Sequence, residues 1–108
     1  FDAVFAASDL LAIGTMHALD ACGIRVPEDV AVVGFDDIPM ANYVKPALTT
    51  VQQDTKRAGE LLVERLVQQV RGEAAQSAML PAQLVIRRSC GSRPAAAAGP
   101  AVRAARRR

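Results

Sequence analysis

The stretch Val30-Ala31-Val32-Val33-Gly34-Phe35-Asp36-Asp37 decides the fold of this chain. Four apolar residues, three of them β-branched valines, lead into a glycine, an aromatic residue and two adjacent carboxylates. A short continuous apolar run bounded by turn signals predicts a strand that is buried on both faces. In open parallel α/β sheets, ligands bind beyond the carboxyl ends of the strands. The stretch therefore predicts that its two aspartates lie where a ligand is met.

Further elements follow on either side of this strand. Residues 3–7 form a short apolar run that predicts another buried strand, and the apolar spacing over 10–22 predicts a helix that ends at Gly23. Ser8 and Asp9 both qualify as the N-cap of that helix. Downstream, the sequence predicts a loop at 38–46, a strand at 48–51 and a helix at 55–71 capped by Asp54. Residues 79–80 and 83–88, which Pro81 separates, predict one or two short strands. This order predicts an α/β fold with a mainly parallel sheet in three layers, with helices on both faces.

The two predicted helices differ in their surroundings. The helix at 10–22 is apolar nearly all round, and its clearly polar residues are Thr15, His17 and Asp20. Such a helix is buried on more than one side, so one side is expected to pack on the sheet and the other against a second layer or a partner subunit. The helix at 55–71 has a one-sided apolar stripe and is expected to be amphipathic.

The net charge of +2 conceals an asymmetry along the chain. Residues 93–108 hold five arginines and no acid, whereas the rest of the chain holds 8 basic and 11 acidic residues. The body is therefore mildly acidic and lacks the basic face that nucleic-acid binding needs. From Gly91 onward the residues are mainly Ala, Pro, Gly and Arg without apolar periodicity, which predicts a disordered tail over 91–108.

The sequence shows no signal for export, membrane insertion or metal binding. It opens without a signal peptide, and no apolar run approaches the ~20 residues of a membrane span, so a cytoplasmic protein is expected. Cys22 and Cys90 lie far apart with no metal-ligand spacing, so neither a zinc site nor a structural disulfide is expected. The single histidine, His17, has no nucleophile arranged around it and is not expected to be catalytic.

The carboxylate pair Asp36-Asp37 admits three interpretations. One is a solvated turn in which an aspartate caps a short helix. Another is a Mg²⁺-dependent phosphotransfer site, since paired acids beside a strand can hold this ion. The third is a carboxylate that accepts hydrogen bonds from hydroxyl or amine groups of a ligand.

Polar residues at the ends of two other strands favour the third interpretation. Ser8 follows the strand at 3–7, and Gln53 follows the strand at 48–51. Because carboxyl ends of parallel strands meet at one edge of a sheet, Ser8, Asp36 and Gln53 are expected to converge there. We therefore expect a small-molecule binding site without cofactor or metal, and not an enzyme.

Three segments resemble motifs of the lactose-repressor/galactose-repressor (LacI/GalR) family of transcriptional regulators. Residues 5–14 (FAASDLLAIG) resemble the family's F-A-x-[N/S]-D-x-x-A-x-G segment. Residues 23–37 (GIRVPEDVAVVGFDD) resemble G-x-x-V-P-x-D-[VI]-[AS]-[VI]-[VI]-G-[FY]-D-[DN]. Residues 46–54 (PALTTVQQD) are similar to P-x-L-T-T-[VI]-x-Q. The likeness covers about residues 3–90, in order and at the spacing of the family.

This resemblance implies the C-terminal part of an effector-sensing domain with the periplasmic-binding-protein type I fold. Two α/β lobes of that fold enclose a small molecule, commonly a sugar or a nucleobase. In the family, the aspartate of the G-[FY]-D motif binds the ligand, with contributions from the residue before the D of the first motif and from the Gln of the third. By resemblance, the ligand-binding residues here are Asp36, Ser8 and Gln53.

The resemblance also implies partners and boundaries. Residues 1–90 would be the C-terminal part of the sensor domain, with the helix at 55–71 belonging to the other lobe. The implied homodimer interface comprises Ile13, Met16, His17, Met40, Tyr43 and Val44. Operator DNA would be contacted only through an N-terminal helix-turn-helix that these residues do not contain. The alternative is a sugar-binding protein of an uptake transporter, which shares the fold.

Overall fold

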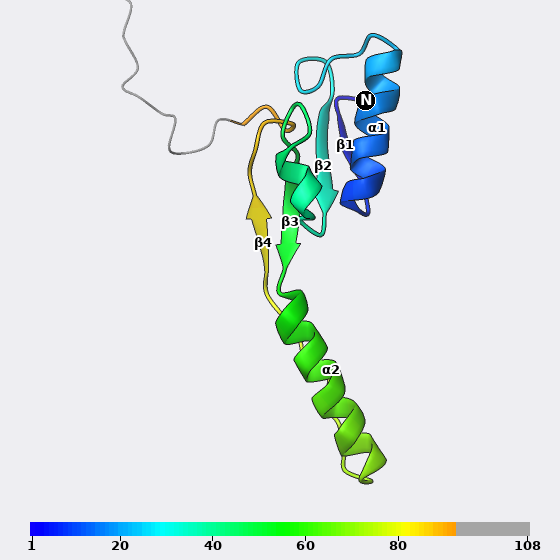
Figure 1. Ribbon diagram of the computed structural model, residues 1–108, viewed down its shortest axis with the longest axis vertical. Helices are drawn as coiled ribbons and strands as arrows, with labels where there is room; N and C mark the ends of the chain where they lie inside the picture. Colours follow the sequence, from blue (N-terminus) through cyan, green and yellow to red (C-terminus); the bar gives the residue numbers. More distant parts are fainter. Residues whose placement is uncertain (93–108) are drawn as a thin grey trace, which may run out of the picture.

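The computed structural model describes residues 1–92 and shows a four-stranded sheet with one helix packed on it and a second projecting away (Figure 1). In chain order the elements are β1 (Ala3–Phe5), α1 (Asp9–Ala21), β2 (Ala31–Phe35), the 3₁₀ turn η1 (Pro39–Asn42), β3 (Thr49–Gln53), α2 (Thr55–Val70) and β4 (Ala82–Val85). Residues 31–35 of the apolar stretch that precedes the two aspartates form β2. The predicted disordered tail at 91–108 lies outside the described residues from residue 93 onward.

The sheet is mostly parallel, which confirms the predicted α/β class. β1 pairs with β2 and β2 with β3 in parallel, and β4 pairs antiparallel with β3. Of the one or two strands predicted around Pro81, one is present, because Met79 and Leu80 are in no strand. β4 begins at Ala82, whose partner Gln53 is the last residue of β3, so no part of β3 remains for the earlier residues to pair with.

The hydrophobic core lies between α1 and one face of the sheet. Ala12, Met16 and Leu19 share one side of α1 and are buried in one cluster with Val32 of β2. Leu48, which precedes β3, is completely buried in the same cluster. Burial of each large aliphatic side chain of this kind stabilises the fold by roughly 1.5–3 kcal/mol. The core therefore fixes α1 against the strands whose carboxyl ends carry the predicted site.

Apolar surfaces remain uncovered on both sides of this two-layer unit. On the outer side of α1, Leu10 and Leu11 are exposed. On the sheet face turned away from α1, the rings of Phe5 and Phe35 meet edge to face with centroids 6.4 Å apart, yet Phe5 and Leu84 are 65% and 60% exposed. Residues 1–92 thus supply two of the three layers expected of this fold class.

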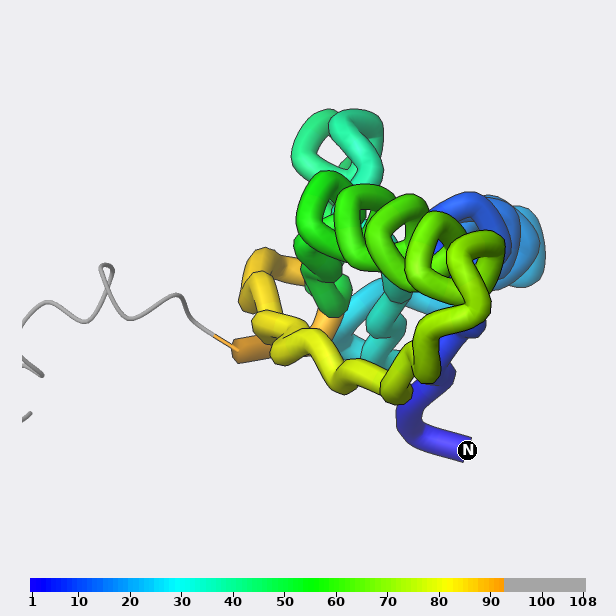
Figure 2. Tube along the Cα trace, turned by 90° about the horizontal axis from the view of Figure 1, so that it is seen from below, coloured from blue at the N-terminus to red at the C-terminus, as the bar shows by residue number. Residues whose placement is uncertain are grey.

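Helix α2 projects away from the sheet and has no buried residue. The carboxylate of Asp54 caps its N-terminus by accepting a hydrogen bond from the Arg57 amide at 2.9 Å, as predicted. After the helix the chain returns alongside it to β4 (Figures 1 and 2). One side of α2 carries exposed apolar residues, here called the α2 stripe: Leu62, Val63, Leu66, Val67 and Val70. Such a stripe is typical of a helix that packs on another layer of protein.

The loop before β2 is closed by an ion pair between Arg25 and Asp29. The Asp29 carboxylate accepts hydrogen bonds from the backbone N, Nε and Nη2 of Arg25 at 2.9, 2.8 and 2.6 Å. The side-chain hydrogen bonds from Arg25 are the main cause that lowers the pKa of Asp29 from 3.8 to about 2. Because the pair is exposed to solvent, its contribution to stability is small.

This pair predicts a specific dependence of stability on pH. A carboxyl group whose pKa is depressed in the folded state contributes stability above its ordinary pKa of 3.8 and loses it as the pH falls toward about 2. We expect Asp29→Asn to lower the thermal midpoint slightly at neutral pH, and the difference from the wild type to shrink between about pH 4 and about pH 2. Thermal unfolding followed by circular dichroism across this range measures it. A difference that stays constant would contradict the assignment.

Candidate functional site

The turn after β2 has an unusual backbone. Asp36 and Asp37 have φ angles of 112° and 53°, in the region that side chains other than glycine rarely adopt. Aspartate tolerates left-handed conformations better than most residues, but two in succession persist only where neighbouring groups hold them. The amide of Asp36 donates to the Val51 carbonyl at 2.9 Å, and the amide of Asp37 donates to Thr50 Oγ1 at 3.3 Å. Strand β3 therefore holds the backbone of the turn.

The buried carboxylate of Asp9 also supports this turn. Asp9 is completely buried, and its Oδ1 accepts a hydrogen bond from Thr50 Oγ1 at 2.5 Å. Its Oδ2 accepts a hydrogen bond from the Ile38 amide at 2.8 Å. The alternative that Asp9 caps α1 is wrong, because the hydroxyl of Ser8 takes that role and accepts from the Leu11 amide at 3.3 Å. Asp9 instead links α1, β3 and the turn after β2.

Gly34 makes room for this carboxylate. A Cβ at position 34 would overlap Asp9 Oδ1 and lie 3.0 Å from Leu48 Cδ2. We expect Gly34→Ala to lower the free energy of unfolding by about 1–3 kcal/mol, since the buried neighbours have little space to move. Chemical denaturation of the full-length protein measures the change. Gly14→Ala is the matched control because nothing lies within 4 Å of its added methyl, and an unchanged midpoint for Gly34→Ala would contradict the expectation.

The structure brings together two of the three predicted ligand-binding side chains. Gln53 Nε2 donates to Asp36 Oδ1 at 3.1 Å, and both residues are exposed at the carboxyl edge of the sheet. Ser8 lies at the same edge because β1 and β2 are in parallel register, but it forms no hydrogen bond with either residue. The Ser8 hydroxyl accepts from the helix, so its hydrogen stays available to donate to a ligand.

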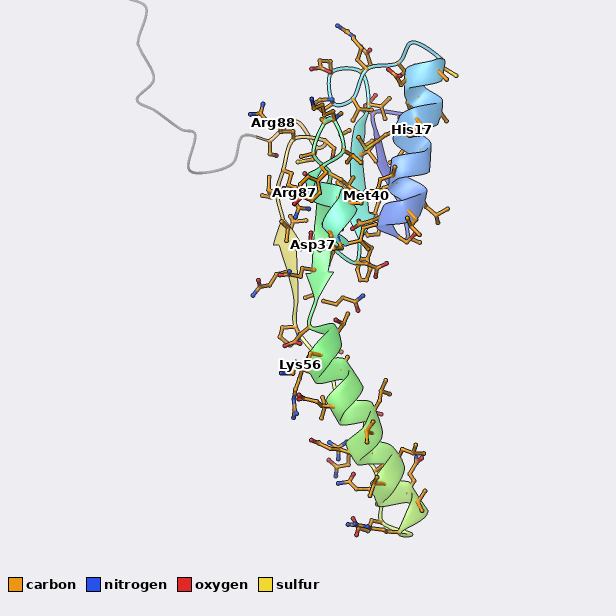
Figure 3. All side chains as sticks on the ribbon, viewed as in Figure 1. His17, Asp37, Met40, Lys56, Arg87 and Arg88 are labelled. Carbon is orange, nitrogen blue, oxygen red and sulfur yellow. The ribbon has the colours of Figure 1, made fainter. Side chains whose placement is uncertain are left out.

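The neighbouring carboxylate, Asp37, faces the protein instead. Its Oδ1 forms an ion pair with Arg87 Nη2 at 2.7 Å, and its Oδ2 accepts from Gln52 Nε2 at 3.0 Å. The side chains of Asp37 and Arg87 are only 12% and 17% exposed. Figure 3 shows these two side chains beside β3. Reasoning from the sequence did not single out Arg87, although a cation in a β-branched, apolar strand segment was an available signal.

Two cavities are lined by residues close to the predicted site. A cavity of about 210 Å³ is lined by Asp37, Tyr43 and Arg87 among others, and one of about 400 Å³ lies where β3 meets α2 and is lined in part by Gln53. Neither is lined by Ser8 or Asp36. Asp36 and Gln53 are exposed at this edge of the sheet, which suits a ligand that is held from a second side as well.

Four of the six predicted interface residues line one cavity. A cavity of about 460 Å³ is lined by Ile13, Met16 and His17 of α1 and by Val44 of the loop before β3, among others. His17 is exposed on α1, and Met40 projects from η1 (Figure 3). Met40 and Tyr43 are 55% and 80% exposed but do not line this cavity, and Tyr43 lines the cavity of about 210 Å³ beside Asp37 and Arg87. Met16 differs from the others, because it is 6% exposed and packs in the core, where it forms only the floor of this cavity.

The described residues lack two features that would point to other functions. Within residues 1–92, no three His, Cys, Asp or Glu side chains gather in a way that could hold a metal ion. Neither α1 nor α2 is long and apolar enough to cross a membrane. Cys22 and Cys90 are both free thiols.

Comparison with known proteins identifies the family. The sequence profile described as "Periplasmic binding protein-like domain" matches residues 2–90. The chain belongs to this family. It is 43% identical to the HTH-type transcriptional regulator CelR of Thermobifida fusca over 90 residues, which are 82% of this chain and 26% of CelR. It is 40% identical to the HTH-type transcriptional repressor PurR of Proteus mirabilis over 94 residues, which are 85% of this chain and 28% of PurR.

Solved structures of regulators share the fold. The complex of the transcriptional regulator CelR with cellobiose superposes with a TM-score of 0.73 at 43% identity, covering 82% of this chain and 28% of that one. The lac repressor dimer bound to operator and the anti-inducer ONPF superposes with a TM-score of 0.73 at 38% identity, covering 82% and 31%. These findings confirm the resemblance to LacI-type regulators. The chain spans about a quarter of the length of the curated relatives.

Proposed function

We propose that residues 1–90 are the C-terminal part of the effector-sensing domain of a LacI-type transcriptional regulator. In this proposal a small molecule binds beside Asp36, Ser8 and Gln53, and closes the site against the second lobe. The observation that carries it is the pairing of exposed Asp36 and Gln53 at the carboxyl edge of a parallel sheet, on a turn that the fold holds in an unusual conformation. The relatives support a regulator rather than an uptake protein, since CelR, PurR and the lac repressor are transcriptional regulators.

The geometry supports a neutral, hydroxyl- or amine-rich effector. Asp36 offers a carboxylate that accepts hydrogen bonds, and Gln53 keeps its carbonyl oxygen after donating its amide to Asp36. Arg87, which pairs with the turn, is engaged by Asp37 and by the Leu48 carbonyl and is not free for an anionic ligand. A sugar and a nucleobase both carry suitable donors, and the cellobiose complex of CelR supports the sugar.

The alternative of a Mg²⁺-dependent phosphotransfer site is less well supported by this geometry. Both oxygens of Asp37 are paired with protein groups, Arg87 and Gln52. A cation close to the carboxylate also opposes a metal ion electrostatically. The relatives are transcriptional regulators, and we propose no catalytic role for this chain.

A ligand panel tests the proposed function. The full-length regulator is heated with a set of neutral mono- and disaccharides, including cellobiose, and with purine bases. A ligand that binds only the folded state raises the melting temperature with concentration, and we expect such a shift from a member of the panel. The same compound should change operator occupancy in a gel-shift assay. If the folded protein gives no shift with any sugar or base, the proposal is wrong.

We further propose that the regulator forms a homodimer through α1 and the loop at 38–46. Support comes from Ile13, His17 and Val44, which line one cavity although they come from two segments of the chain. Tyr43 and Met40 are exposed and belong to the same loop as Val44. The lac repressor structure is a dimer bound to operator. Operator contact would rest on a helix-turn-helix outside these residues, and the mildly acidic body is consistent with that division.

We also propose that α2 belongs to the second lobe, which leads to a prediction about the 108-residue chain in isolation. The α2 stripe exposes side chains such as Leu62, Leu66 and Val70, and exposed patches of this kind promote association. We expect the isolated chain to self-associate and to bind a dye that reports apolar surface, whereas the full-length regulator does not. Sedimentation and dye fluorescence measure this, with Leu66→Glu as a variant expected to reduce both signals. A monomeric chain with one cooperative melting transition would contradict the proposal.

A further inference from the structure

Arg87 occupies a central position in the support of the turn. It follows β4, and its Nη2 pairs with Asp37 Oδ1 at 2.7 Å while its Nη1 donates to the Leu48 carbonyl at 2.8 Å. Its backbone amide donates to Thr49 Oγ1 at 2.9 Å. A guanidinium can serve two acceptors at once because its donors diverge in a fixed plane. Arg87 therefore ties the turn after β2 to the beginning of β3.

The pair between Arg87 and Asp37 lies at the residues with positive φ angles. Positive φ angles at non-glycine residues are strained, and they persist where several contacts with the surroundings hold them. Asp36 is exposed, and its side chain is held by one hydrogen bond, from the equally exposed Gln53. Asp37 is nearly buried and is held through both of its oxygens. The firm attachment of the turn is therefore at Asp37, one residue away from the group that would meet the effector.

The side chains that bond to Asp36 and Asp37 come from two segments, one before helix α2 and one after it. Gln52 and Gln53 are the last residues of β3 before the chain enters α2, and Arg87 follows β4, on which it returns. We propose that Arg87 is a positioning residue of the effector site. It acts through Asp37, does not touch the effector, and keeps Asp36 within hydrogen-bond distance of Gln53. The role in effector binding rests on the proposed function, whereas the effect on the turn does not.

The chain offers a matched control one residue away. Arg88 carries the same charge, is exposed, and its side chain forms no hydrogen bond within residues 1–92 (Figure 3). Arg87→Met and Arg88→Met therefore make the same change in net charge and side-chain volume. Only the first removes the pair with Asp37.

The experiment uses the full-length regulator and needs no effector. Hydrogen exchange is measured at the amides of Asp36, Asp37 and Ile38, all of which have acceptors in the structure. We expect Arg87→Met to speed their exchange at least about tenfold, as loss of a charged hydrogen bond implies, and Arg88→Met to leave it unchanged. The amide of Ala12 in α1 serves as an internal reference for global stability.

A second readout reports the position of Asp36 itself. In protein labelled with ¹⁵N-glutamine, the side-chain amide of Gln53 senses its bond to Asp36. We expect Arg87→Met to move this signal toward that of a solvent-exposed glutamine, and Arg87→Lys, which keeps a cation beside Asp37, to restore it in part. If Arg87 only stabilised the fold in general, Arg87→Met would lower global stability without a selective change in the Gln53 signal, and Arg87→Lys would not restore that signal.

The outcomes separate this proposal from the proposed function. If Arg87→Met does not fold, Asp37→Asn removes the charge of the pair with nearly the same shape and should speed exchange at the same amides. Exchange and Gln53 signals like those of the wild type in the folded variants would overturn the positioning role, whatever the ligand panel shows. If the protein binds no sugar or base but Arg87→Met still speeds exchange at these amides selectively, the proposed function is wrong and the positioning role of Arg87 stands.

Discussion

Asp36→Asn in the full-length regulator should abolish the response to the effector while leaving operator binding intact. The amide has the shape of the carboxylate, but it removes the charge and replaces one acceptor by a donor. A hydrogen bond to a charged group contributes about 1.5–3 kcal/mol, so the affinity for the effector should fall roughly 10- to 150-fold. Isothermal titration with the compound found in the panel measures the affinity, and a gel shift measures operator binding.

Asp2→Asn is the control for the loss of one negative charge. Asp2 is exposed before β1 and its side chain forms no hydrogen bond in the part of the chain that the structure describes. Normal induction in Asp36→Asn would refute its assignment as a ligand-binding residue. Loss of operator binding together with loss of induction would show a general folding defect instead, which the thermal midpoint of each variant detects.

Asp9→Ala should cause the largest loss of stability among single changes near the site. The substitution leaves the Thr50 hydroxyl and the Ile38 amide without their acceptor in a buried place. Each unsatisfied buried group costs about 1–3 kcal/mol, so the free energy of unfolding should fall by about 2–6 kcal/mol. Denaturant unfolding of the full-length protein measures the change, and faster exchange of the Ile38 amide should accompany it.

Two further variants serve as controls for Asp9→Ala. Asp20→Ala removes an exposed carboxylate from the same helix and should leave stability nearly unchanged. Asp9→Asn keeps one acceptor oxygen and should fall between the wild type and Asp9→Ala. A wild-type unfolding midpoint for Asp9→Ala would show that the buried hydrogen bonds of Asp9 do not support the fold.

The elements that could be predicted from the sequence are those with local signals. The continuous apolar run predicts β2, and Gly23 predicts the end of α1, because burial and backbone conformation at these sites depend on neighbouring residues. Met79 and Leu80 show the limit of such signals. Their apolar character suits a strand, but a strand also needs a partner, and β3 has none left at that point.

The residues of the candidate site likewise include some that local sequence signals predict and one that they do not. Asp36 and Gln53 were predicted from their places at strand ends, and parallel register brings them together. Asp9 was misjudged as a candidate cap because an acid at the start of a helix is a common local pattern. Its actual partners, Thr50 and Ile38, are 41 and 29 residues away and leave no trace in the sequence around it.

The sequence by itself determined that a buried strand delivers two carboxylates to the binding edge of an α/β sheet. The resemblance to the LacI/GalR family selects Asp36 rather than Asp37 as the ligand-binding residue, but only the tertiary structure gives the physical reason. Asp36 and Asp37 are adjacent and chemically identical, so composition and spacing alone do not separate them. Their roles differ because Arg87, 50 residues further along the chain, pairs with Asp37 and draws it inward. Contacts over such a distance arise only when the strands assemble, and here they leave Asp36 exposed beside Gln53.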